Sequence, residues 1–124
     1  MVIIGWGEGM KIIIPRYRSK SRNITAYKHW RSYQRERDEI ADLVWGYTDH
    51  KTRFDGKKQV HVKIIAYYKS YPVDASNIDD KAYVDALMKS KIIPDDNPYI
   101  NPMVIKQVVT GSADNHVEII VKEI

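Results

Sequence analysis

In residues 60–66 every second side chain is apolar, and this pattern constrains the fold more than any other feature of the sequence. These apolar residues are Val60, Val62, Ile64 and Ala66, and the residues between them are His61, Lys63 and Ile65. A period of two residues is that of a half-buried β-strand. The chain therefore contains a strand of a sheet that has one face on a core, and we expect this strand to extend to about Lys69.

The flanking patterns predict two helices and three further strands. We expect strands over 10–14, 104–109 and 117–124, and helices over 26–45 and 77–89. Thr25 is a candidate N-cap of the first helix, Gly46 is its expected end, and the turn over 111–115 should join the last two strands as an antiparallel hairpin. Both helices show apolar side chains at helical spacing, among them Ile40, Val44 and Leu87.

The sequence thus predicts a mixed α/β (α+β) fold, in which a small mixed sheet with a C-terminal antiparallel hairpin is packed by two main helices. A length of 124 residues suits a single compact domain over 1–124. Residues 1–9 show no clear pattern and could be an N-terminal extension, with Met10 as an alternative start to Met1.

The absence of cysteine excludes disulfides, thiolate zinc sites and cysteine nucleophiles. No apolar run approaches the roughly 18–20 residues of a membrane span. The first ten residues lack the basic region and the apolar stretch of a signal peptide. We therefore expect a soluble cytoplasmic protein that has no membrane partner.

Charge is segregated along the chain, although the net charge of +4 is modest. Residues 16–35 carry seven basic side chains and no acid, whereas residues 74–96 carry six aspartates against three lysines. This pattern suits a polyanion bound by a basic surface around an acidic, metal-holding centre. A solvated basic face without a partner is the alternative interpretation.

The aspartates between Asp74 and Asp96 have the chemistry of a magnesium site, because Mg²⁺ prefers carboxylates, waters and phosphate oxygens. Asp74 follows the predicted strand, Asp79 and Asp80 begin the second helix, and Asp95 and Asp96 follow that helix. A helix of about 13 residues spans roughly 20 Å, so Asp96 would have to fold back along it to meet Asp74. Taken singly, each aspartate also suits a helix cap or a turn, and Asn77 with Asp80 resembles a capping pair.

The segment also resembles a known family. Asp-x-x-Asn over 74–77, Asp-Ala-Leu over 85–87 and Ile-x-Pro-Asp-Asp over 92–96 are similar to the signature of RusA-type Holliday junction resolvases. These are small endonucleases that phages and prophages often encode. The similarity follows the order of elements along nearly the whole chain. By this resemblance, Asp74 corresponds to the first family aspartate, Asn77 to the asparagine, and Asp96 to the later metal-binding aspartate, with Asp95 beside it.

Two positions depart from the family pattern. Ser76 stands where the family has a second aspartate, and Lys81 lies one residue further from Asn77 than the family lysine does. Asp79 or Asp80 could supply the missing carboxylate from the start of the helix. Serine could ligate weakly through its hydroxyl or hold a metal-bound water.

The resemblance implies a homodimer that nicks four-way DNA junctions symmetrically in recombination and repair, in a bacterial or phage-infected cell. The implied cofactor is Mg²⁺, with Mn²⁺ as a substitute, and no small-molecule cofactor is needed. Asp74 and Asp96 would hold the metal, and Lys81 would stabilise the charge of the transition state. The residues expected to contact the DNA backbone are Arg16, Arg18, Lys20, Arg22, Lys57 and Lys58. The rival hypothesis is a catalytically weakened or inactive protein of the same fold that only binds junctions.

Overall fold

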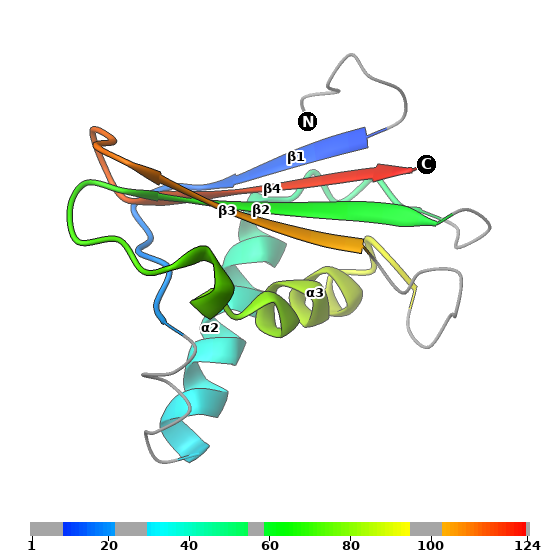
Figure 1. The fold of residues 1–124 in the computed structure, drawn as a ribbon. Helices are drawn as coiled ribbons and strands as arrows, with labels where there is room; N and C mark the ends of the chain where they lie inside the picture. The colour runs from blue at the N-terminus through cyan, green and yellow to red at the C-terminus, as the bar shows by residue number, and fades with distance from the viewer. Residues whose placement is uncertain (1–8, 22–29, 55–58, 95–102, 124) are drawn as a thin grey trace.

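The structure is a computed structural model, and it describes residues 9–21, 30–54, 59–94 and 103–123, without the side chains of residues 30–33 and 103. In chain order the elements are β1 (Gly9–Ile14), α2 (Trp30–Tyr47), β2 (Val60–Tyr68), the 3-10 helix η1 (Ala75–Asn77), α3 (Asp80–Lys89), β3 (Met103–Thr110) and β4 (His116–Glu123) (Figure 1). The predicted α+β fold, a small mixed sheet packed by two helices, is confirmed.

The four strands form one sheet in the order β1-β4-β2-β3. β4 runs antiparallel to both of its neighbours, whereas β2 and β3 are parallel. Both helices lie on the same face of the sheet, beneath it in Figure 1, and no described helix covers the opposite face. The molecule therefore has two layers, with its core between the sheet and the helices.

The core is built from alternate residues of three strands, β1, β2 and β4, whose inward-facing side chains are buried. Ile12 of β1 is level with Ile119 of β4, which is level with Ile64 of β2, so that one apolar row crosses three strands. All three side chains are at most 1% exposed. Ile40 and Val44 of α2 are also buried, as their helical spacing predicted. The period-two interpretation of residues 60–66 is thereby confirmed.

The predicted C-terminal hairpin is wrong, because β2 lies between β3 and β4 and these two strands do not pair. The connection over 111–115 passes the end of β2, where the Ser112 amide donates a hydrogen bond to the Tyr68 carbonyl (3.1 Å). Two strand spacings are only about 10 Å, which five residues can span. In the central position, β4 buries Val117, Ile119 and Val121 against neighbours on both sides.

The end of α2 differs from the prediction, since the helix continues through Gly46 to Tyr47. The Thr48 amide donates to the Val44 carbonyl (3.0 Å) and closes the last turn. The predicted N-cap Thr25, together with the expected first turn, lies outside the described residues. Neither α2 nor α3 is long and apolar enough to cross a bilayer, and the described residues contain no other α-helix.

α3 ends in a Schellman motif that does not use glycine. The Ile92 amide donates to the Leu87 carbonyl and the Lys91 amide to the Met88 carbonyl, both at 3.0 Å, with Lys91 at a φ of 61°. The Ile92 carbonyl then accepts from the Phe54 amide at 2.8 Å. These contacts hold the exit of α3 next to the segment that leads into β2.

Ser19 joins three parts of the chain that are distant in sequence. Its hydroxyl lies 2.9 Å from the Tyr83 hydroxyl of α3, and its carbonyl accepts from the Tyr68 hydroxyl of β2 at 2.7 Å. Ser19, Tyr68 and Tyr83 are all at most 2% exposed. Burial raises the pKa of the Tyr83 hydroxyl and so favours its protonated form. The network ties the segment after β1 to the sheet and to α3.

Replacing Tyr83 with Phe should lower the free energy of unfolding by about 1–2 kcal/mol, because the buried Ser19 hydroxyl loses a partner. Urea unfolding followed by circular dichroism measures this change. Tyr47→Phe is the control, since Tyr47 is 46% exposed and its substitution should change stability by less than about 0.5 kcal/mol. Equal effects of the two substitutions would show that the Ser19 network contributes no stability.

Candidate metal and DNA site

The acidic segment lies in the connection between two parallel strands. β2 and β3 are paired from His61 with Met103 to Tyr68 with Thr110. Parallel neighbours require a crossover, because the chain must return to the end from which the first strand started. Here the crossover contains η1 and α3, and η1 packs against the edge strand β3. The fold therefore brings residues 74–80 to the edge of the sheet.

Asp74 occupies the N-cap position of η1, and the Asn77 amide donates to its carbonyl at 2.9 Å. Its carboxylate makes no capping hydrogen bond, and it forms no ion pair or hydrogen bond with a described residue. The side chain is exposed. Asp74 is thus held by its backbone while its carboxylate remains available for a ligand.

Asp79 and Asp80 have other partners in this structure. Asp79 is 8% exposed and is the N-cap of α3, where its carboxylate accepts from the Ala82 amide at 3.4 Å. The sequence had suggested Asn77, paired with Asp80, as the cap of this helix. Asp79 holds that position instead, and Asn77 lies in η1. Asp80 lies 3.8 Å from the Lys106 ammonium. The described contacts of these two carboxylates are with Ala82 and Lys106, and none of them is with Asp74.

Lys106 is a residue of this site that sequence reasoning missed. Its ammonium donates to the carbonyls of Ser76 (3.2 Å) and Ile78 (3.5 Å) and forms the ion pair with Asp80. A signal was present, because the period of β3 puts Lys106 on the same face as the partly buried Val104 and Val108. A lysine at a core-facing strand position requires partners, and the η1–α3 turn supplies them.

The remaining predicted residues of this site are Ser76, Asn77, Lys81, Asp95 and Asp96. Ser76 is exposed. Asn77 is half-buried and has a further interaction besides the hydrogen bond from its amide to Asp74. Lys81 is exposed on the first turn of α3 and forms no hydrogen bond or ion pair through its side chain with a described residue, so its role stays a prediction. Asp95 and Asp96 lie outside the described residues. Pro94, the last described residue before them, follows the C-terminal end of α3, whereas Asp74 precedes its N-terminal end.

The donor set fits a hard cation only in part. Among the residues that the structure describes, no three Asp, Glu or His side chains lie close enough to hold a metal ion together. Asp74 offers an available carboxylate, and Mg²⁺ is commonly bound through one or two carboxylates plus waters and substrate phosphates. A second carboxylate would have to come from Asp95 or Asp96, or from Asp80 after release from Lys106.

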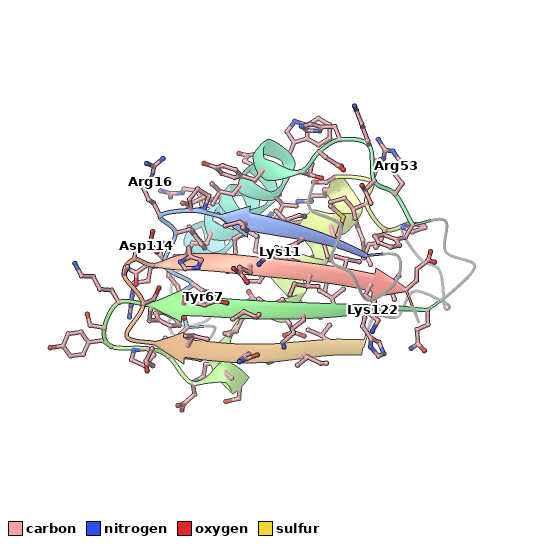
Figure 2. All side chains as sticks on the ribbon, turned by 90° about the horizontal axis from the view of Figure 1, so that it is seen from above. Lys11, Arg16, Arg53, Tyr67, Asp114 and Lys122 are labelled. Carbon is pink, nitrogen blue, oxygen red and sulfur yellow. The ribbon has the colours of Figure 1, made fainter. Side chains whose placement is uncertain are left out.

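The predicted DNA-contacting residues divide into three groups: two with partners in the chain, one that is exposed, and three outside the described residues. Arg18 has partners within the chain. Its guanidinium donates to the carbonyls of Ser70 and Tyr71 and lies 4.9 Å from the centre of the Tyr68 ring. Lys20 pairs with Glu36 of α2 at 3.4 Å. Arg16 is exposed in the turn after β1 (Figure 2). Arg22, Lys57 and Lys58 lie outside the described residues.

Comparison of the sequence with protein families and with curated proteins finds no family and no protein that matches it. The resemblance to RusA-type resolvases therefore rests on residues 74–96 and on the order of the elements.

Replacing Lys106 with Met should loosen the turn over 75–80, because the carbonyls of Ser76 and Ile78 and the Asp80 carboxylate lose their cation. Hydrogen bonds to charged groups are worth roughly 1.5–3 kcal/mol, and less at this partly exposed position, so the Ile78 and Asp80 amides should exchange about tenfold faster. Native-state hydrogen exchange measures this rate. Gln107→Met is the matched control on the opposite face of β3 and should leave these amides unchanged; unchanged exchange in Lys106→Met would contradict the assignment.

Proposed function

We propose that this protein is a magnesium-dependent endonuclease that resolves four-way DNA junctions as a homodimer. The observation that supports the proposal most directly is Asp74, an exposed carboxylate with no partner among the described residues, in the crossover that carries the family-like signature. A structural cap or turn aspartate would be expected to use its carboxylate locally, as Asp79 does. Asp74 does not.

The chain's own residues would divide the work as follows. Asp74, together with Asp96 of the signature, would hold Mg²⁺, which when bound supplies Lewis-acid stabilisation of the scissile phosphate. Lys81, exposed at the start of α3, would place a positive charge near the leaving oxygen. Lys106 would keep the backbone of Ser76 and Ile78 in position beside Asp74. Lys106 is a positioning residue in this scheme, because it acts through the turn.

A second function is favoured by the engaged aspartates. Ser76 replaces a family carboxylate, and the two candidates for replacing it, Asp79 and Asp80, serve as a helix cap and as an ion-pair partner. A protein that binds junctions without cutting them would show this arrangement. The two hypotheses differ in one observable, which is nicking of the bound DNA.

Nicking of a synthetic four-way junction in the presence of Mg²⁺ tests the proposal. We expect wild-type protein to nick two opposing strands, and Asp74→Asn and Asp96→Asn each to lower the rate by about 100-fold or more, because each removes charge that the metal requires. Asp42→Asn is the matched control, since Asp42 is an exposed aspartate of α2 outside the signature; it should retain full activity.

Tight binding to the junction without any nicking by the wild-type protein would overturn the enzyme and leave the binding protein. Equal affinity for the junction and for a linear duplex of the same length would count against both hypotheses.

A further inference from the structure

The face of the sheet that points away from the helices has a distinct composition. The strand registers bring four of its side chains into one row, in the order Lys11, Ile120, Lys63 and Ile105. Lys122 and His61 are level with each other in the next row. Figure 2 looks onto this face and shows Lys11, Tyr67 and Lys122 on it. Ile105 is 45% exposed, which is unusual for a residue on a strand that is paired in parallel.

Positive charge dominates this open face. It carries Lys11, Lys63 and Lys122, and the one acidic side chain among the strand residues that share the face is Glu118. Both carboxylate oxygens of Glu118 are engaged, one with the Lys11 ammonium at 3.2 Å and the other with the Tyr67 hydroxyl at 3.1 Å. The opposite layer is acidic, because the described side chains of α2 include Glu36, Asp38, Glu39 and Asp42 against Arg35 and Arg37.

A hollow of about 410 Å³ opens on this face, toward the end of the sheet where β2 and β3 begin, and is lined by His61, Lys63, Ile105, Ile120 and Lys122. Lys63 lies between the two isoleucines, because it is level with Ile120 on one side and Ile105 on the other. It forms no ion pair with the residues that the structure describes. The hollow thus presents the Lys63 ammonium next to apolar side chains, a combination that complements phosphate attached to a sugar and a base.

An aromatic pair lies further along the same face. The rings of Tyr67 and His116 are stacked, with centroids 4.1 Å apart and planes inclined by 10°. His116 also lies 2.8 Å from the Asp114 carboxylate, which holds its ring in place. Bases of single-stranded nucleic acids stack on aromatic side chains on open sheets, with phosphates paired to nearby cations. The hollow with Lys63 and the pair of Tyr67 and His116 together resemble such a surface.

We propose that the open face of the sheet is a second contact surface for DNA, on which a phosphodiester lies over Lys63 and the attached sugar and base cover Ile105 and Ile120. Charge favours this occupant over a second copy of the chain. The Lys11–Glu118 pair is neutral as a whole, and a two-fold interface centred on this face would bring the Lys63 ammonium groups of the two copies together. A polyanion has the complementary charge.

The surface goes beyond the proposed nuclease, because none of its residues belongs to the crossover. The two sites share the edge strand β3, whose Ile105 faces the hollow and whose Lys106 holds the η1–α3 turn on the other side. DNA that crosses the open face would therefore leave it over the same edge that carries Asp74.

Fluorescence anisotropy with a labelled 20-nucleotide single strand and the matching duplex, in EDTA so that no cutting occurs, tests the proposal. Lys63→Gln should weaken binding by about eightfold at 0.1 M salt and lower the slope of log K against log salt by roughly 0.7–0.9, the loss expected for one phosphate contact. Lys63→Arg should restore both values. Lys89→Gln, which removes the same charge from α3 on the opposite layer, should leave both unchanged.

Equal salt slopes for wild type and Lys63→Gln would overturn the proposal, as would absence of DNA binding by the wild type in EDTA. A change in the monomer–dimer equilibrium of Lys63→Gln in sedimentation, with DNA affinity unaltered, would assign the face to a second copy instead. The assay contains no metal and measures no cutting, so a failure of the nuclease proposal and a failure of the binding proposal give different results.

Discussion

The parallel pairing of β2 with β3 is the constraint on which the rest of this structure depends. Parallel neighbours cannot be joined by a tight turn, so the chain between Tyr68 and Met103 must cross from one end of the sheet to the other. α3 packs on the core during this return, and its C-terminal Schellman motif directs the chain toward the start of β2. Residues 74–80 of the signature are placed at the sheet edge as a consequence of this crossover.

The edge contains one electrostatic arrangement that organises the turn. A lysine on the core-facing side of β3 cannot be left without partners, and the carbonyls of Ser76 and Ile78 with the Asp80 carboxylate satisfy it. This engagement occupies Asp80, and the capping of α3 occupies Asp79. Asp74 is then the described carboxylate of the signature that stays available, which sharpens the consequence of having Ser76 in place of an aspartate.

The elements could be predicted from local patterns, because the periods of residues 60–66 and of 80–89 reflect burial against a single core. Strand order could not. The turn over 111–115 suits a hairpin, yet it carries no information about β2, whose buried inward face takes the place beside β4. The roles of Arg18 and Lys20 were also beyond local reasoning, since their partners Ser70, Tyr71 and Glu36 are distant in sequence. The role of Lys106 could have been predicted from the period of its strand, because a charged side chain at a core-facing position requires polar partners nearby.

The central claim is that the crossover holds a metal ion through Asp74, and paramagnetic broadening by Mn²⁺ tests it most directly. Substoichiometric Mn²⁺ added to the ¹⁵N-labelled protein should broaden the amide signals of Asp74, Ser76 and Asn77 first, together with those of Asp95 and Asp96. Excess Mg²⁺ should reverse the effect, and Asp74→Asn should abolish it. Broadening centred on the acidic residues of α2, such as Asp38 and Asp42, with the signals of residues 74–77 unaffected, would contradict the account.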